Sequence, residues 1–134
     1  MKIAILMGRG IEGCGVTRYA IETQKWYHKN NMVCDIYASL DKKWPRRQLQ
    51  QNNIIEFTNS EIQALSKKLN SEYDVIFYQS LPAKKGHSED YQNQFLDYLV
   101  KDIEKPIKIA FQNDHKLQSL TRNANIWETM RYMD

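Results

Sequence analysis

Cysteine is scarce in this sequence, and long apolar runs and a strong excess of one charge are missing. The two cysteines, Cys14 and Cys34, are too few for a disulfide framework and lack the spacing of metal ligands, so we expect a reducing compartment and no metal site. No apolar run is long enough to cross a bilayer, and we expect no membrane association. A formal net charge of +3 is too small to indicate a polyanionic partner by itself.

The chain of 134 residues suffices for one domain with one apolar core. Short apolar runs alternate with longer amphipathic stretches, which is the pattern of β-α-β units around a parallel sheet. We predict one α/β domain over residues 1–134, with a Rossmann-like parallel sheet of about five strands and flanking helices. Its ligand side is the edge at which the strands end. The predicted strands are residues 3–7, 32–38, 53–57, 73–78 and 107–111.

Four helices are predicted from apolar positions that recur every three or four residues. The first runs from Val16 to about Asn30, and the second begins after Ser60, which we expect to be its N-cap. Their apolar positions are Val16, Tyr19, Ala20, Thr23, Trp26 and Tyr27 in the first helix, and Ile62, Leu65 and Leu69 in the second. Those of the third and fourth helices are Tyr91, Phe95, Tyr98, Leu99, Ile103, and Leu117, Leu120, Ile126, Trp127, Met130.

Four of the five glycines fall in the turn after the first predicted strand. Residues 8–13 satisfy the pattern G-x-G-x-x-G, in which glycine lets the backbone approach a ligand closely. The N-terminus of the following helix offers N–H groups and partial positive charge to a phosphate. We therefore predict a phosphate-binding turn that contains Gly10, Gly13, Cys14 and Gly15.

Two other interpretations of this turn stay open. The glycines could serve only to turn the chain tightly beneath the helix. A dinucleotide site is the other alternative, with Asp35 at roughly the distance of a ribose-binding acid. Two features argue against it: Asp35 lies inside the second predicted strand rather than at its end, and Gly15 lengthens the turn.

Several blocks of this sequence resemble the DNA α-glucosyltransferases of T-even bacteriophages. Residues 7–19, MGRGIEGCGVTRY, are similar to the N-terminal turn of those enzymes, and residues 80–83 and 112–115 are similar to two later loops. Further matching residues are Ser119, Leu120, Arg122, Asn123, Glu128, Thr129 and Arg131. These enzymes consist of two Rossmann-like domains that face a cleft. The resemblance implies that residues 1–134 form the N-terminal, acceptor-side half of such a GT-B glycosyltransferase, without the donor-binding C-terminal half.

The resemblance also implies a reaction and its partners. The family transfers glucose from UDP-glucose to hydroxymethylcytosine in DNA, with retention of the anomeric configuration. We accordingly expect double-stranded DNA as a partner, UDP-glucose as co-substrate, no intrinsic cofactor, and action in the cytoplasm of an infected bacterial host. A C-terminal glycosyltransferase half or a second copy of the chain is expected to complete the enzyme.

One departure from the family lies at the reacting centre. The family carries Gln-His-Asp-His after the fifth strand, whereas this chain has Asn113 in place of the first histidine, followed by Asp114 and His115. An amide hydrogen-bonds a sugar hydroxyl but does not exchange a proton near neutral pH. By resemblance, Asp114 stabilises an oxocarbenium-like centre. The alternative is that Asp114 only caps the last helix.

A basic loop follows the second predicted strand. Its cationic residues surround Trp44, and a second basic segment precedes His87. Basic side chains neutralise DNA phosphates, and a tryptophan stacks on an extruded base, so we predict a DNA contact; a solvated charged loop is an equal alternative. The predicted DNA-binding residues are Lys42, Lys43, Trp44, Arg46, Arg47, Lys84 and Lys85.

Two functions therefore remain at this point. The first is part of a DNA glycosyltransferase, which the complete glycine-rich turn favours. The second is a non-catalytic binding protein derived from such an enzyme and directed at a host or phage protein during infection. The asparagine at position 113 and the lack of a donor domain favour the second.

Overall fold

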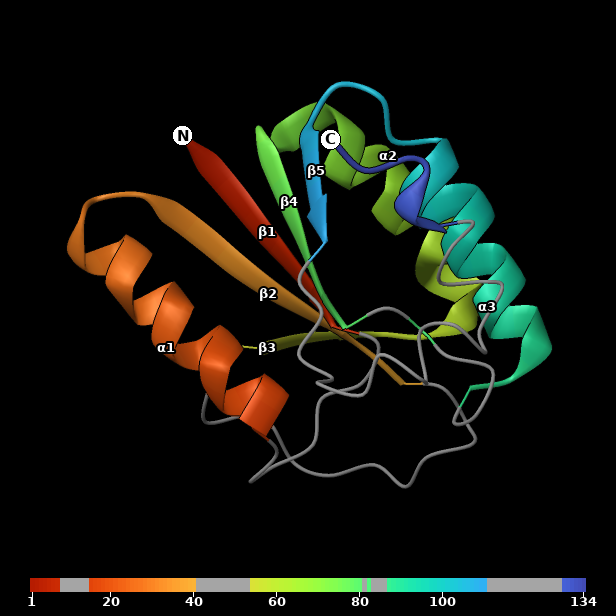
Figure 1. Ribbon diagram of the computed structural model, residues 1–134, viewed down its shortest axis with the longest axis horizontal. Helices are drawn as coiled ribbons and strands as arrows, with labels where there is room; N and C mark the ends of the chain where they lie inside the picture. Colours follow the sequence, from red (N-terminus) through yellow and green to blue (C-terminus); the bar gives the residue numbers. More distant parts are fainter. Residues whose placement is uncertain (8–14, 41–53, 81, 83–86, 111–128) are drawn as a thin grey trace.

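Five parallel strands form one sheet in the order β3-β2-β1-β4-β5, with helices on both of its faces (Figure 1). The computed structural model describes residues 1–7, 15–40, 54–80, 82, 87–110 and 129–134. The predicted α/β class and the five parallel strands are confirmed. The strands are β1 Lys2–Met7, β2 Val33–Ser39, β3 Ile54–Phe57, β4 Val75–Ser80 and β5 Ile107–Ala110.

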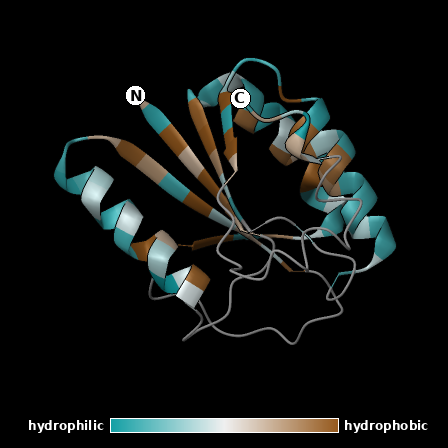
Figure 2. Cartoon of the chain, in the orientation of Figure 1, coloured by the Kyte–Doolittle hydropathy of each residue, from teal (hydrophilic) through white to brown (hydrophobic). Residues whose placement is uncertain are grey.

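Strand β1 lies in the middle of the sheet because its apolar run suits burial on both faces. Ile3, Ile5 and Met7 point to one face, and Ala4 and Leu6 point to the other. All five side chains are buried. Two apolar cores therefore meet the sheet, one on each face, and Figure 2 shows the hydrophobic colour concentrated along the strands.

Helix α1, Gly15–Lys29, covers one face of the sheet (Figure 1). The boundaries agree with the prediction, and the predicted buried stripe is confirmed in part, since Ala20 is buried and Val16 and Tyr27 pack against the core. Thr17, Ala20 and Gln24 are buried, whereas Tyr19 is 47% and Trp26 is 58% exposed. With 3.6 residues per turn, positions 19 and 26 lie roughly half a turn from position 17. The stripe that meets the sheet thus combines the predicted Val16, Ala20 and Tyr27 with two buried polar residues, Thr17 and Gln24, which apolar periodicity does not reveal.

Helix α2, Ile62–Glu72, and helix α3, Glu89–Leu96, cover the opposite face (Figure 1). Helix α2 is preceded by a 3-10 turn, so Thr58 rather than the predicted Ser60 is the N-cap of this helical segment. The reason is the Thr-x-x-Glu sequence, in which the Glu61 carboxylate accepts from the Thr58 backbone N–H at 3.1 Å.

Helix α3 continues into a π-helical turn, η3, Asp97–Lys101, which the sequence does not predict. Side chains from the sheet donate hydrogen bonds to carbonyl groups in this turn and just after it. Tyr78 donates its hydroxyl to the Leu99 carbonyl at 2.6 Å. The buried Lys108 donates its Nζ to the Val100 and Ile103 carbonyls at 3.1 and 2.7 Å. The turn therefore depends on strands that lie elsewhere in the chain.

Strand β4 begins two residues later than predicted. Tyr73 was expected in the strand, but it is the C-cap of α2, and its ring packs into the larger core. Strand β2 is likewise shifted by one residue, since it ends at Ser39.

The fourth predicted helix is described only at its end. Thr129 and Met130 are helical, and Met130 is 41% exposed rather than buried, whereas Leu117, Leu120, Ile126 and Trp127 lie outside the described residues. The backbone N–H of Asp134 donates to the Lys108 carbonyl at 2.7 Å, on the outer side of β5. Among the described helices, none has the length and apolar character needed to cross a bilayer.

Candidate ligand-binding edge of the sheet

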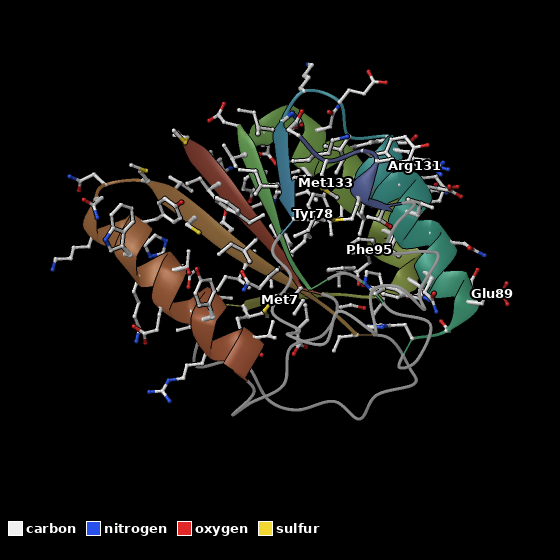
Figure 3. The ribbon with its side chains drawn as sticks, viewed as in Figure 1. Met7, Tyr78, Glu89, Phe95, Arg131 and Met133 are labelled. Atoms are coloured by element: carbon white, nitrogen blue, oxygen red, sulfur yellow. The ribbon has the colours of Figure 1, made fainter. Side chains whose placement is uncertain are left out.

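The five parallel strands place their carboxyl ends at one edge of the sheet, and Figure 3 shows Met7, the last residue of β1, at this point. Nearly all predicted site residues follow these strand ends in the sequence. Gly15 is within the described part of the chain. The remaining ones lie outside the described residues: Gly10, Gly13, Cys14, Lys42, Lys43, Trp44, Arg46, Arg47, Lys84, Lys85, Asn113, Asp114 and His115.

The N-terminus of α1 lies at this edge and is suited to an anion. Gly15 is the first residue of the helix, and the first turn contains no acidic side chain but includes Arg18. A Cβ atom built on Gly15 meets no heavy atom within 4 Å, so there is open space at this position. The first turn of α3, in contrast, carries Glu89 and Asp90. Helix-terminal N–H groups and the helix dipole attract negative charge, which the first turn of α1 does not itself supply.

Three polar side chains at the same edge have buried atoms without a hydrogen-bond partner in the part of the chain that the structure describes. They are the Ser39 hydroxyl in β2, the Asn59 carbonyl just after β3, and the Gln79 amide nitrogen in β4. Ser39 is 6% and Gln79 is 2% exposed. Buried polar groups normally have partners, so these three are candidates for ligand contact. Sequence reasoning missed them, although Ser39 and Gln79 directly follow apolar runs and Asn59 lies two residues after β3.

Gln79 occupies an irregularity in the sheet. Leu6 of β1 pairs with Tyr78 of β4, but Met7 pairs with Ser80, so Gln79 is an extra residue in β4. Such bulges redirect a side chain and are common beside functional sites. The bulge lies next to the end of β1, where the glycine-rich turn begins in the sequence.

Asp35 does not lie where a ribose-binding acid of a dinucleotide fold is needed. It pairs with Ala4 and lies four residues before the end of β2, and its carboxylate accepts a hydrogen bond from the Tyr73 hydroxyl at 2.6 Å. Tyr37 extends this network, with its hydroxyl 2.7 Å from that of Tyr73. Burial raises the pKa of Tyr73 well above its ordinary value, and the hydrogen bond to Asp35 adds to the shift. The Asp35 carboxylate thus accepts a hydrogen bond from a core tyrosine. It is not available as the ribose-binding acid that the dinucleotide interpretation requires.

His87 was expected beside the basic segment at residues 84 and 85, on the DNA-facing side. The structure buries it at 7% exposure and stacks its ring on Tyr91, with 5.2 Å between the centroids. Its imidazole therefore packs against α3 and is not part of an exposed basic surface. The reason is its position directly before the Ser88 N-cap of α3.

No cluster of three or more histidine, cysteine, aspartate or glutamate side chains suited to a metal occurs among residues with described positions. Cys34 is buried, and burial raises the pKa of its thiol to about 12, with a further contribution from the charge of Asp35. A thiol with this pKa is a poor nucleophile and a poor ligand at neutral pH.

Comparison with known proteins decides the family. The family model described as DNA alpha-glucosyltransferase matches residues 14–134, nearly the whole chain. The chain belongs to the DNA alpha-glucosyltransferase family.

A curated relative is the DNA alpha-glucosyltransferase of Enterobacteria phage T4. It is 30% identical over 137 residues, and the match covers all of this chain but 34% of that protein. This member of the DNA alpha-glucosyltransferase family therefore spans about a third of the length of the curated relative.

Solved structures of alpha-glucosyltransferases share the same fold. One, in complex with UDP and a 13-mer DNA containing an HMU base, has a TM-score of 0.84 and 30% identity, over all of this chain and 36% of that one. Another, in complex with UDP-glucose and DNA containing an abasic site, has a TM-score of 0.83 and 30% identity, over all of this chain and 34% of that one. The five-stranded sheet of this chain thus matches a Rossmann-like half of a two-substrate glucosyltransferase.

Proposed function

We propose that this chain is the N-terminal, acceptor-side domain, or a separate subunit, of a phage DNA glycosyltransferase that moves a sugar from a UDP-sugar, with UDP-glucose as the expected donor, to hydroxymethylcytosine in DNA. The observation that carries the proposal is the family match over residues 14–134. Related structures hold UDP, UDP-glucose and DNA, which supports the same substrates here. The reaction takes place in the cytoplasm of the infected host.

The donor side of the proposed site is the first turn. Gly10, Gly13, Cys14 and Gly15 bring the backbone close to the donor diphosphate. Support comes from the open space beside Gly15 and from the first turn of α1, which lacks an acidic residue. The N-terminus of α1 attracts negative charge, and in this proposal the phosphate groups of the ligand provide it.

The reacting centre of the proposed site is the segment after β5. The Asp114 carboxylate stabilises the positive charge that develops on the sugar ring as the bond to UDP breaks. Asn113 hydrogen-bonds a sugar hydroxyl and transfers no proton, and His115 lies beside them in the sequence. Proton removal from the acceptor hydroxyl therefore does not use position 113.

The DNA side of the proposed site is the basic loop after β2 together with Lys84 and Lys85. Its lysine and arginine side chains neutralise phosphates of the duplex, and Trp44 stacks on an extruded base. This arrangement presents the hydroxymethyl group outside the base stack, where the donor sugar can reach it.

The remaining donor contacts belong to a second, C-terminal half in this proposal. The chain spans about a third of the curated relative, and the rest of that length is available to bind most of the nucleotide. A further segment, a separately encoded subunit or a second copy of this chain supplies the second half. A second candidate function, a non-catalytic binding protein directed at a host or phage protein, is favoured by Asn113 in the place of histidine.

Calorimetric titration of the purified chain tests the proposal. UDP and UDP-glucose are titrated into the chain, alone and with hydroxymethylated duplex DNA, and unmodified duplex is the control. We expect nucleotide binding that Gly13→Val abolishes, because a side chain blocks the close approach of the backbone. The Asp114→Asn variant is expected to bind UDP normally, since its role lies at the sugar. A folded chain that binds neither nucleotide nor DNA would favour the protein-binding function instead.

A further inference from the structure

A polar groove runs between helix α2 and the π-helical turn η3. Two adjoining hollows of about 400 and 230 Å³ form it, and both are lined by Gln63 and Tyr98. Their combined size lies in the range of small-ligand sites. The residues that line the groove belong neither to the proposed donor turn nor to the basic loops or the reacting segment.

Two polar stripes line this groove from facing elements. Residues three or four apart share one face of a helix. The stripe on α2 consists of Gln63, Ser66 and Asn70, and the stripe on α3 and η3 consists of Gln94, Tyr98 and Asp102. Amide, hydroxyl and aromatic groups from two separate elements therefore meet in the groove.

The backbone around Tyr98 is fixed by hydrogen bonds from other elements. The Ser66 hydroxyl donates to the Tyr98 carbonyl, and the Tyr78 hydroxyl donates to the Leu99 carbonyl. Ser66 is 6% exposed and itself lines the groove. The side chain of Tyr98 packs partly against the larger core and lines both hollows. A π-helical turn is rare and occurs frequently at functional sites, and this one presents an aromatic ring to the groove.

The side chains of the groove provide both donors and acceptors of hydrogen bonds. The Gln94 amide nitrogen donates to the Asp90 carboxylate at 2.9 Å, which leaves the Gln94 Oε1 atom as an acceptor. The Gln63 amide and the Tyr98 hydroxyl each offer a donor and an acceptor. Neither group makes a hydrogen bond to another side chain in the described part of the chain.

The charges of the groove do not favour an anion. Lys67 and Asp102 contribute one charge of each sign. Phosphate oxygens only accept hydrogen bonds, so they do not match the acceptors of Gln94 and Asp102. Hydroxyl groups both donate and accept, and they match the mixed set.

We propose that this groove binds a hexopyranose sugar, with the Tyr98 ring against a C–H face of the sugar and the Gln63 amide on its hydroxyl groups. A pyranose ring carries hydroxyl groups around its rim and C–H groups on its faces, so amides and an aromatic ring together suit it. The site is separate from the donor site and goes beyond the proposed function. A free sugar and a sugar already attached to DNA present the same ring to it.

Nuclear magnetic resonance titration of the isotope-labelled chain tests the site. Methyl α-glucopyranoside is expected to shift the signals of Gln63 and Tyr98 and to saturate them with a dissociation constant of about 1 mM, since the groove is open and the ligand neutral. Gln63→Leu is expected to weaken binding about fivefold, as for the loss of neutral hydrogen bonds, and Tyr98→Leu to abolish it. Asn93→Leu removes an exposed amide of α3 outside the groove and is expected to bind as wild type does. Because Gln63 is exposed, its variant is expected to keep the wild-type midpoint of urea unfolding.

The source and the class of the ligand follow from further titrations. Uridine and inorganic phosphate are expected to leave the groove signals unchanged. A duplex that carries glucosylated hydroxymethylcytosine and shifts these signals at lower concentration than the free glucoside supports the site, with the attached sugar as its source. A duplex without effect, beside a glucoside that binds, supports the site with a free sugar as its source.

Three results overturn the inference. Glucoside shifts that do not saturate, or that saturate equally in the wild-type chain and Gln63→Leu, overturn the site. Uridine that binds the groove as tightly as the glucoside overturns the sugar class. Binding of UDP and of hydroxymethylated DNA tests the proposed function separately, so either idea can fail without the other.

Discussion

Removal of the Tyr73 hydroxyl group from the larger of the two apolar cores is expected to cost a large part of the free energy of unfolding of this domain. Tyr73 donates to the Asp35 carboxylate at 2.6 Å and lies 2.7 Å from the Tyr37 hydroxyl. Tyr73→Phe keeps the ring, which packs at 4% exposure, and removes both bonds. A hydrogen bond to a charged group contributes about 1.5–3 kcal/mol, and a buried hydroxyl left without a partner costs about 1–3 kcal/mol. We expect the free energy of unfolding to fall by about 3 kcal/mol.

Urea unfolding followed by circular dichroism measures this change. Tyr37→Phe is expected to cost less, about 1 kcal/mol, because the Asp35 carboxylate keeps its donor. The double variant is expected to be more stable than the sum of the single losses predicts, since both remove the same bond. Tyr132→Phe, at a side chain 39% exposed, is the control and should change stability by less than about 0.5 kcal/mol. A Tyr73→Phe variant within about 0.5 kcal/mol of wild type would refute the argument that this network stabilises the core.

Three further predictions follow from the described geometry and the proposed site. Lys108→Met leaves two carbonyl groups of the π-helical region without donors, and we expect it to lower the free energy of unfolding by about 2 kcal/mol, measured by urea unfolding. The control is Lys25→Met, which removes a surface ion pair and should lower the free energy of unfolding by less than about 0.5 kcal/mol. In a Cys14→Ser variant, Cys34 should not react with a thiol reagent at pH 8 until the chain is unfolded. Burial raises the pKa of this thiol from 9.0 to about 12, so the contribution of the neutral thiol to stability is complete below pH 9 and is lost as the pH rises to about 12. In a fluorescence titration, Trp44→Ala should weaken binding of hydroxymethylated duplex DNA more than it weakens binding of UDP. Equal binding of the duplex by the wild-type chain and the Trp44→Ala variant contradicts a base contact.

The strands were predictable because each is a short apolar run between polar turns, and a parallel sheet buries both faces of its central strands. The boundaries were less predictable where a residue serves another element. Tyr73 looks like the start of β4, but its ring and hydroxyl belong to the core beneath α2. The predicted stripe of α1 was wrong at Tyr19 and Trp26 because apolar character was taken as burial. It also left out Gln24, which is buried through its hydrogen bond to a strand carbonyl. Such pairings depend on distant residues.

The sheet edge that the candidate site residues follow was predictable, and the buried polar side chains at this edge were not. Parallel strands gather their carboxyl ends, so the sequence already indicates which loops meet. Gln79 looks like the first residue of a polar loop, but a bulge keeps it in β4 and buries its amide. The burial of His87 under α3 likewise depends on the ring of Tyr91, one helical turn further along the chain. The burial of Gln79 depends on the register with the distant strand β1, whereas that of His87 depends on where α3 begins.

The unequal cover of the two sheet faces has a consequence for local unfolding. In the described residues, α1 alone covers the smaller core, whereas α2, α3 and η3 share the larger one (Figure 1). Ala20 is the one apolar side chain of α1 that is fully buried, and Tyr19 and Trp26 are exposed, so we expect α1 to have a lower free energy of opening than α2. Its amides are therefore expected to exchange with deuterium before those of α2. A nucleotide held at the first turn of α1 slows that exchange in proportion to its occupancy, so the helix itself reports on the ligand.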